Sequence, residues 1–532
     1  MRARRVAAGI TAGIAGGAAL IAAISVIARV VGFGRQLVFQ STIGQTVLGE
    51  IFATINALPN VVFEIVAGGA LASVVVPLIA AAASRGDTAH VRQTVSALLG
   101  WTLLVLTPVV LLGALLAGPI TELMLRGKGG AEGIEVGRTM LLVFLPQIPL
   151  YGIAVVTAGV LQAHRRFLAA ALAPIVSSLV VAATFVVFAG LYAGGDRNDL
   201  TALDRRSELI LAGGTTAGVL LLALTTLVPM LIRTTGLRPT LRFPPGVARR
   251  ARGLAGAGIA TLAAQQLAYL TSYLMSNEHA GTGGAVTFLN SWMVYLLPYA
   301  VLAVPIATAA FPRLTTHAED DPAAYARTLA GSTRAVLAAS GIGAAVLVAT
   351  AWPVARFFAL LDQGDVPVER MAWALVAFAP GLLGYGLVAH LGRALYARGR
   401  GRVAATATVS GWLLVAVTAV VLAGAVQEER VTAALGAAHS AGMTLAGVLL
   451  LRGVARDSGP VALFGVGRAL VRVVMAGAAG AAVGWWAATL LPDDSGGMVL
   501  ASGVMAAAAA TAVAGAVIVA TDRDVRRVVL RR

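Results

Sequence analysis

Cysteine is absent from this chain of 532 residues, lysine occurs once, and charged residues make up only 12% of the sequence. Without cysteine the chain has no disulfide, no thiolate metal ligand and no cysteine nucleophile. A soluble protein carries roughly 25% charged residues, so the charge here is about half the usual amount. Hydrophobic residues instead reach 58%, and the mean hydropathy is +0.86. This composition predicts an all-α polytopic membrane protein.

Sequence motifs for catalysis are also lacking. The phosphate-binding pattern G-x-x-x-x-G-K-[ST] does not occur, since the one lysine, Lys128, follows Gly127 without the rest of the pattern. Paired carboxylates, Ser-His pairs and metal-ligand clusters do not occur within the apolar runs. We therefore expect a non-enzyme with no cofactor and no metal site. The net charge of +16 is not gathered in a basic domain, so no nucleic-acid partner is expected.

Apolar runs long enough to cross a bilayer, which takes about 20 residues, recur fourteen times along the chain. Arg2, Arg4 and Arg5 precede the first run, which continues without a clear stop. We therefore expect a retained first span rather than a cleaved signal peptide. The predicted spans cover residues 13–38, 48–83, 95–117, 139–161, 167–193, 208–232, 254–275, 285–311, 333–358, 370–396, 403–426, 431–452, 468–491 and 498–520.

Basic residues are concentrated on one side of the predicted spans and acidic residues on the other. With a cytoplasmic N-terminus, the inside segments hold 29 of the 40 Lys and Arg residues but only 7 of the 24 Asp and Glu residues. The longest basic loop, Arg233 to Arg252, has six arginines and no acid. The positive-inside rule therefore predicts about fourteen transmembrane helices, with the N- and C-termini both in the cytoplasm.

The chain also repeats itself. Pro146–Gly152 (PQIPLYG) is similar to Pro380–Gly386 (PGLLGYG), and Leu161–Arg166 (LQAHRR) is similar to Leu395–Arg400 (LYARGR). Both matches have the same shift along the chain, from 146 to 380 and from 161 to 395. This shift, here called the repeat offset, covers six predicted spans. An even number of spans preserves orientation, so the pattern indicates parallel repeats about an axis along the membrane normal.

The repeat predicts the domain organisation. Leu58-Pro59 and Leu297-Pro298 align at nearly the same offset. We predict two six-helix lobes, an N-terminal lobe at residues 1–232 with helices one to six and a C-terminal lobe at 233–452 with helices seven to twelve. Residues 453–532 then hold two appended helices and a cytoplasmic tail.

The stretch of residues 27–77 is apolar yet contains Arg29, Arg35, Glu50 and Glu64. A charge at the bilayer centre costs about 2.5–3.5 kcal/mol on insertion scales, so such residues normally face a bundle interior or a watery cavity. We therefore predict that this stretch lines a substrate pathway. For the arginines the alternative is snorkelling to the outer interface. For Glu64 the alternative is a structural ion pair.

Residues that loosen a helix lie in the same stretch. Pro59, Gly68 and Gly69 are candidates for a hinge at which the second helix bends between states, with close helix packing as the alternative. Glu50 is a candidate for the mouth of the cavity, with a solvated loop position as the alternative.

Three sequence patterns resemble those of a known family. Ala28–Arg35 (ARVVGFGR) resembles its S-R-x-x-G-x-x-R-[DE] signature on the first helix. Leu58–Asn60 (LPN), followed by Gly69–Leu71 (GAL) and Val76-Pro77, resembles its L-P-N-…-E-G-A-…-P signature on the second. Phe311–Leu314 (FPRL) resembles the L-P-x-[LF] ending of the eighth helix. The family is the MviN/MurJ lipid II flippases, within the MOP exporter superfamily.

The resemblance implies a function. Members have fourteen helices in the bacterial cytoplasmic membrane. They move lipid II, the undecaprenyl-pyrophosphate-linked peptidoglycan precursor, from the inner to the outer leaflet by alternating access. Arg29, Arg35, Asn60 and Glu64 are then the candidate substrate-binding residues, since guanidinium groups bind phosphate oxygens bidentately. The implied partners are lipid II or a related undecaprenyl-pyrophosphate-linked substrate, membrane lipids, and cell-wall synthesis proteins.

Departures from the family pattern keep two other functions open. Phe63 and Glu64 stand where members often have two basic residues, and spans 254–275 and 403–426 lack the acids that bind a cation in some members. One alternative is a MOP-type exporter of another lipid-linked glycan or amphipathic compound. The other is a non-transporting paralogue that scaffolds cell-wall enzymes.

Overall fold

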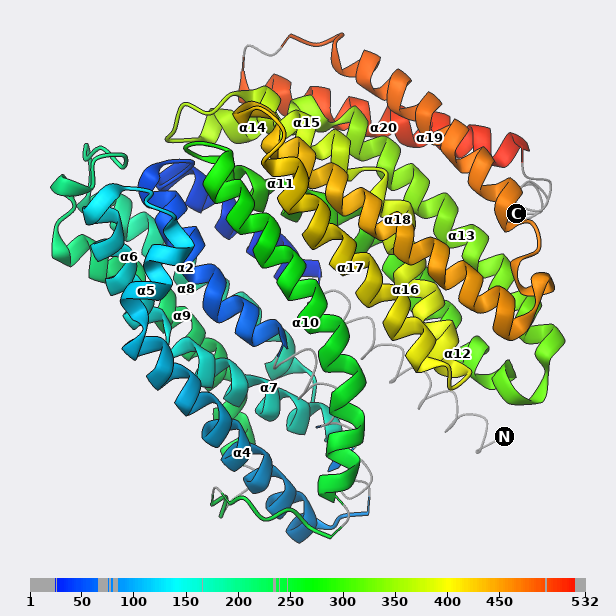
Figure 1. Ribbon diagram of the computed structural model, residues 1–532, viewed down its shortest axis with the longest axis horizontal. Coiled ribbons are helices and arrows are strands. Elements are labelled where there is room, and N and C mark those ends of the chain that lie inside the picture. Colours follow the sequence, from blue (N-terminus) through cyan, green and yellow to red (C-terminus); the bar gives the residue numbers. More distant parts are fainter. Residues whose placement is uncertain are drawn as a thin grey trace, which may run out of the picture. The chain divides into compact units, whose positions relative to one another are not determined.

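Helices make up most of the computed structural model, and none of the residues that it describes lies in a β-strand (Figure 1). The structure describes residues 24, 26–65, 75, 78–79, 85–164, 166–232, 236–238, 240–245, 247–492 and 495–521, without the side chains of residues 248–258 and 319. The predicted all-α class is confirmed. The chain separates into two compact units, divided between Leu262 and Ala263.

The first unit starts with a helical segment at residues 26–42 and ends within α10. Its further helices are α2 (Val47–Phe63), α4 (Thr88–Leu115), α5 (Ala117–Leu125), α6 (Gly130–Phe144), α7 (Gln147–Ala163), α8 (Leu168–Leu191), the short η2 (Leu200–Ala202), α9 (Arg205–Leu231) and the beginning of α10 (Val247–His279).

The second unit takes the rest of α10 and the helices up to the end of the described chain. They are α11 (Gly284–Pro298), the π-helical η3 (Tyr299–Ala303), α12 (Val304–Asp320), α13 (Pro322–Ala349), α14 (Ala351–Leu361), α15 (Val368–Phe378), α16 (Gly381–Ala397), α17 (Gly401–Ala423), η4 (Glu428–Arg430), α18 (Val431–Ser458), η5 (Pro460–Leu463), α19 (Val466–Ala488) and α20 (Gly496–Thr521).

Ten described helices are long and apolar enough to cross a membrane, and the bent pair α15–α16 makes up to eleven. These correspond to eleven of the fourteen predicted spans. The other three, at residues 13–38, 48–83 and 254–275, all include residues or side chains that the structure does not describe. The count of fourteen therefore stays a prediction.

Element boundaries repeat at the offset found in the sequence. Helix α13 has both its ends at the repeat offset from the ends of α4, and α16 has both its ends at this offset from those of α7. The same offset relates the residues that cap the first pair, since Asp87 accepts from His90 N and Asp321 accepts from Ala324 N. The repeat therefore includes the side chains that cap these helices. Such side chains accept hydrogen bonds from amides that the first helical turn leaves free.

A proline stands just beyond the last residue of each of these two long helices. Pro119 and Pro353, again related by the repeat offset, each lie four positions after the last residue of α4 and of α13, Leu115 and Ala349. Proline lacks the N–H that would bond that carbonyl, and its ring clashes with it. The predicted span 333–358 is therefore wrong at its ends, because the helix runs from 322 to 349 and α14 follows as a separate short helix.

Apolar clusters hold each unit together. In the first unit Val95, Val156 and Met230 belong to a buried cluster that joins α4, α7 and α9. In the second unit Leu329, Leu391 and further side chains of α12, α13, α16, α17 and α18 form another. The predicted division into residues 1–232, 233–452 and 453–532 stays a prediction.

The final helix pair packs within the second unit against α13 through small residues. Ala345 and Ala349 of α13 share a buried cluster with Ala506, Ala510 and Ala514 of α20. Helices with small residues at their contacts approach closely, which is how membrane helices associate without a hydrophobic drive of their own.

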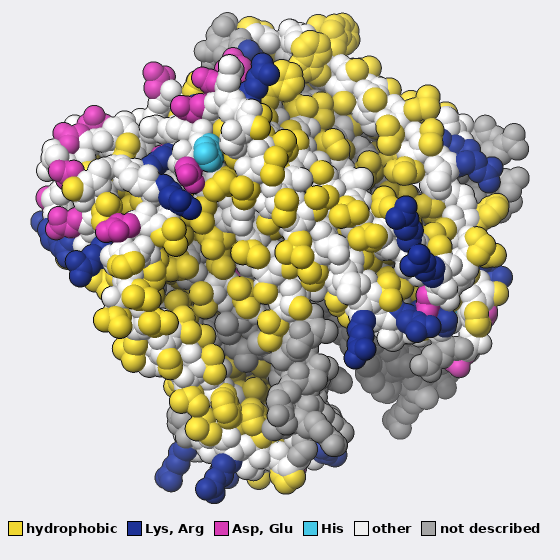
Figure 2. All heavy atoms as spheres, in the orientation of Figure 1, with side chains coloured by type: hydrophobic (Ala, Val, Ile, Leu, Met, Phe, Trp, Pro, Cys, Tyr) yellow, Lys and Arg dark blue, Asp and Glu magenta, His cyan; other side chains and the backbone are white. Residues whose placement is uncertain are grey.

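Charge is distributed unevenly along the first unit. In Figure 2 acidic side chains, together with several basic ones, gather near the end that carries α5 and α6, whereas the charged side chains in view at the end where α4 begins are basic, with apolar side chains between. This arrangement agrees with the separation of basic and acidic loops in the sequence.

The only lysine of the chain forms a buried ion pair. Lys128 Nζ lies 2.7 Å from Glu50 Oε2, and the Glu50 side chain is 1% exposed. Lys128 is presented by a tight turn in which Gly127 and Gly129 have positive φ angles of 83° and 73°, a conformation that glycine adopts without a Cβ penalty. The pair joins the start of α2 to the turn between α5 and α6.

We expect Lys128→Met to destabilise the protein, because a buried carboxylate loses its ammonium partner. Breaking a buried ion pair by removing one partner costs roughly 3–5 kcal/mol. The double variant Lys128→Met/Glu50→Gln should regain part of the loss, since it removes both charges. Thermal unfolding in detergent measures this, and a single variant as stable as the parent would contradict a stabilising pair.

Candidate functional site

The predicted site residues that the structure describes lie on the first helical segment, on α2 and directly after α2. One tyrosine of α7 contacts α2 at this place. Tyr151 on α7 donates a hydrogen bond from its hydroxyl to Asn60 Oδ1 at 3.1 Å. Asn60 Nδ2 in turn donates to the Asn56 carbonyl at 2.8 Å. The Phe63 ring packs on the Tyr151 ring with their centroids 4.3 Å apart. These contacts fix the Asn60 side chain and join α2 to α7.

Charged residues surround this tyrosine. Arg35 and Glu64 both lie within electrostatic range of the Tyr151 hydroxyl. Arg35 is half-buried, whereas Glu64 and Arg29 are exposed. Among the described residues no ion pair joins Glu64 to either arginine. The structure thus brings Arg35, Asn60 and Glu64 together around Tyr151 and leaves Arg29 outside this group.

A buried oxygen beside the group has no protein partner in the described part of the chain. It is Asn56 Oδ1, one helical turn before Asn60. A buried acceptor without a partner costs about 1–3 kcal/mol, so it is a natural position for a donor supplied by a ligand.

The predicted hinge is only partly described. Pro59 is buried inside α2, and Glu64 and Ile65, just after it, are π-helical. Gly68 and Gly69 lie outside the described residues. The second unit repeats the arrangement, because Pro298 ends α11 and is followed directly by the π-helical η3. π-Helical turns are rare and occur often at functional sites, which agrees with bending at this point.

Glu50 is not a solvated loop residue. Its side chain is 1% exposed and bonded to Lys128 at the start of α2. The loop before α9 also fixes this helix start, since the Arg197 carbonyl and Asn198 Oδ1 accept from the amides of Leu48 and Val47. Its predicted place at the mouth of a cavity stays a prediction.

The second unit has its own aromatic group at the position that the repeat relates to Tyr151. Tyr385, at the repeat offset from Tyr151, stacks on Tyr299 with their centroids 4.1 Å apart. Beside it, the buried His439 Nε2 shares a hydrogen bond of 2.9 Å with the Tyr295 hydroxyl. The ring centroids of Trp292 and Trp412 lie 4.9 Å and 5.5 Å from that of His439. Tyr385 of this unit therefore adjoins aromatic rings and a histidine.

Sequence reasoning missed Tyr151 as a member of the site. The signal was present, because Tyr151 and Tyr385 are the tyrosines of the repeated PQIPLYG and PGLLGYG segments. The partnership of His439 with Tyr295 spans 144 residues, and no spacing rule along the chain predicts it.

Comparison with solved structures defines the class of the fold. The chain superposes on a structure titled lipid II flippase MurJ in an inward closed conformation, with a TM-score of 0.71, covering 93% of this chain and 97% of that one at 15% identity. It also superposes on an inward-facing multidrug resistance MATE family transporter of the MOP superfamily, with a TM-score of 0.67, covering 81% and 95% at 15% identity. The chain therefore has the fold that these two structures share.

Comparison of sequences gives the family. The family model described as lipid II flippase MurJ matches residues 39–494, and the chain therefore belongs to the MurJ family. A probable lipid II flippase MurJ of Vibrio cholerae is 24% identical over 399 residues, covering 71% of this chain and 72% of the relative. The lipid II flippase MurJ of Burkholderia cenocepacia is 24% identical over 385 residues, with the same coverage. The resemblance seen in the three motifs is confirmed.

The hydrogen bond between Tyr151 and Asn60 can be tested by a double-mutant cycle. Tyr151→Phe keeps the ring on Phe63 but removes the hydroxyl, and Asn60→Ala removes the acceptor. We expect each variant to lose about 1 kcal/mol of stability and the double variant to lose less than the sum. Thermal unfolding in detergent is the measurement.

The matched control for this cycle is Tyr192→Phe, whose hydroxyl bonds the Asp196 carbonyl in the loop after α8. Combined with Asn60→Ala its effect should be additive. If the losses of stability also add in the Tyr151→Phe/Asn60→Ala double variant, the Tyr151 hydroxyl does not act through Asn60.

Proposed function

We propose that this protein moves lipid II from the inner to the outer leaflet of the bacterial cytoplasmic membrane by alternating access. The observation that carries the proposal is the match of the MurJ family model to residues 39–494, together with a fold shared with MOP transporters. The family consists of transporters, and the described helices make a multi-pass membrane protein.

The group around Tyr151 supplies the chemistry for an anionic head group. The half-buried Arg35 offers a planar guanidinium that binds two phosphate oxygens at once. Asn60 is already fixed by two hydrogen bonds, so little further side-chain ordering is needed when a ligand arrives. Asn56 Oδ1 remains as an acceptor for a sugar hydroxyl or a peptide amide.

Glu64 gives this site a way to release what it binds. Its exposed carboxylate lies on the helix turn after Asn60, within electrostatic range of the same Tyr151 hydroxyl as Arg35. A carboxylate near the arginine competes with pyrophosphate for the cation and repels the anion. Together with the proline and π-helical turn of α2, it links the charge of the site to bending of the helix.

As the driving force we propose the membrane potential acting on charged groups of the site. Moving one elementary charge across the membrane potential is worth about 2.3 kcal/mol per 100 mV. Arg35 and Glu64 carry opposite charges, so the potential favours one facing state only through the charge that moves further across the membrane.

The other candidate is export of a different lipid-linked glycan or of an amphipathic compound. It is favoured by Phe63 and Glu64, since one is an aromatic ring on Tyr151 and the other an acid beside it. A site with one near cation and one acid is less suited to a pyrophosphate than a site with several cations. Depletion of the protein separates the two, because lipid II accumulates on the inner side only if lipid II is the substrate.

Orientation is tested by reporter fusions. We expect fusions after Arg252 and Arg402 to report a cytoplasmic position, and fusions near Asp199 and Glu428 an external one. The reason is the excess of arginine in the inside segments. One reversed fusion in mid-chain would break the model of fourteen spans with both termini inside.

Substrate binding is tested with Arg35 variants as the sole copy in cells. Arg35→Ala should abolish exposure of lipid II on the outer leaflet, and Arg35→Lys should rescue it only in part, because lysine lacks the bidentate fork. Arg29→Ala should also reduce transport if the exposed Arg29 meets substrate during the cycle. Glu64→Gln should bind the head group more tightly and release it more slowly.

The matched control is Arg138→Ala, an exposed arginine on α6 of the same unit. It should transport normally at equal protein level. Normal lipid II exposure in cells with Arg35→Ala would rule out a required role for Arg35.

A further inference from the structure

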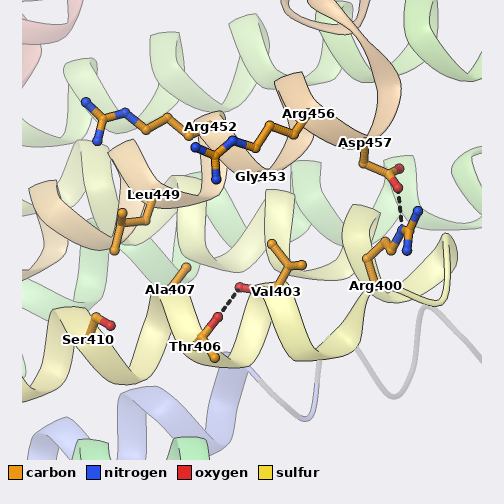
Figure 3. A pocket seen from close by; sticks show the side chains of 10 residues that line it. All are labelled: Arg400, Val403, Thr406, Ala407, Ser410, Leu449, Arg452, Gly453, Arg456 and Asp457. Atoms are coloured by element: carbon orange, nitrogen blue, oxygen red, sulfur yellow. Dashed lines mark hydrogen bonds and ion pairs between the residues drawn. The ribbon is translucent and has the colours of Figure 1, made fainter.

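A groove separate from the Tyr151 group lies between α17 and α18 of the second unit. Figure 3 shows α18 contributing two arginines on one side and α17 contributing small and polar side chains on the other. Its volume is about 470 Å³. The residues that line it are Arg400, Val403, Thr406, Ala407, Ser410, Leu449, Arg452, Gly453, Arg456 and Asp457.

One end of the groove is closed by an ion-pair network. Asp457, 7% exposed, takes Arg400 Nε at 2.6 Å on one carboxylate oxygen and Arg398 Nε at 3.2 Å on the other. Arg398 is held further by the Ala318 carbonyl and lies over the Tyr325 ring. The single acid of the groove is therefore fully engaged by two arginines.

The remaining two cations have no acid to neutralise them. Arg452 and Arg456, one helical turn apart on α18, are exposed, and neither pairs with an acid among the described residues. In Figure 3 both side chains run in the same direction along the groove, away from Asp457. With three arginines and one aspartate lining it, the groove has a net charge of +2.

Glycine makes room for the groove. Gly453 forms part of the wall, and a Cβ there would lie 2.8 Å from Val403 Cγ1. Further along, Gly411 of α17 and Gly442 of α18 bring the two backbones together, since a Cβ on Gly442 would lie 2.5 Å from the Gly411 carbonyl oxygen. The helices therefore approach closely beyond the groove and leave space near the arginines.

An exposed apolar stripe continues from the groove along α17. Val403, Thr406 and Ser410 recur at the helical spacing of three and four residues. The same spacing continues to Leu413, Val417 and Val420, which are 46%, 60% and 49% exposed. A polar and cationic end followed by an exposed apolar stripe matches a molecule with an anionic head and a hydrocarbon tail.

We propose that this groove binds an anionic phospholipid of the surrounding bilayer. The phosphate lies between Arg452 and Arg456, the Ser410 hydroxyl donates to the head group, and an acyl chain follows the α17 stripe. Thr406, whose hydroxyl donates to the Arg402 and Val403 carbonyls, lines the wall. Basic pockets between transmembrane helices on the cytoplasmic side bind such head groups, and the predicted orientation puts this end of α18 in the cytoplasm. The site shares no residue with the proposed transport site.

The test uses the purified full chain in nanodiscs or detergent, with phosphatidylglycerol, phosphatidylcholine and inorganic phosphate as separate probes. Phosphatidylglycerol should bind and raise the unfolding temperature, and phosphatidylcholine and phosphate should do neither. Arg452→Gln/Arg456→Gln should bind phosphatidylglycerol roughly thirtyfold more weakly, since each basic residue near the surface contributes about 1 kcal/mol. The exposed arginine variant Arg327→Gln on α13 should bind as the parent does.

Two substitutions that leave the charge unchanged test whether the lipid binds in the groove or is only attracted by the positive charge. Gly453→Leu and Thr406→Leu fill the space and keep every arginine, so both should weaken binding. Thr406 is exposed, and this variant remains informative where Gly453→Leu fails to fold. Undiminished binding by Thr406→Leu, or by the double arginine variant, overturns the proposal. Equal protection by inorganic phosphate overturns it as well, because it identifies an anion site without a lipid.

Discussion

Within a bilayer each polar group must find its partner inside the protein, because the hydrocarbon offers none. Much of this structure depends on that constraint. Glu50 is held by Lys128, Asn60 by Tyr151, and His439 by Tyr295. Arg370 likewise gives its guanidinium to the carbonyls of Ala280 and Thr282 at the end of α10. Each pairing joins two segments that lie far apart in the sequence.

The two units use one frame for different chemistry. Matched helices, caps and prolines recur at the repeat offset, and a tyrosine on α7 and on α16 stacks on an aromatic ring in both. In the first unit that tyrosine has Arg35 and Glu64 near it, whereas in the second it adjoins aromatic rings and a histidine.

Much of the fold could be predicted from the sequence, and the reasons are local. Long apolar runs, proline positions and the repeated motifs depend only on neighbouring residues, so they were enough for eleven of the spans and for the offset. The break between α13 and α14 at Pro353 was not predicted, because a proline does not always end a helix, as Pro108 inside α4 shows. The site was harder, because the bond of Tyr151 to Asn60 joins residues 91 apart and depends on how α2 and α7 pack.

The lengths of α4 and α13 have a consequence for the membrane itself. Both helices have 28 residues, which at about 1.5 Å per residue exceeds the hydrocarbon thickness of about 30 Å. Such helices tilt or project, and both end at a proline-defined break before a short helix. The two helices have equal length and are related by the repeat offset. A thinner or thicker bilayer therefore imposes the same hydrophobic mismatch on each unit. Bilayer thickness therefore acts on both halves of the transporter in the same sense.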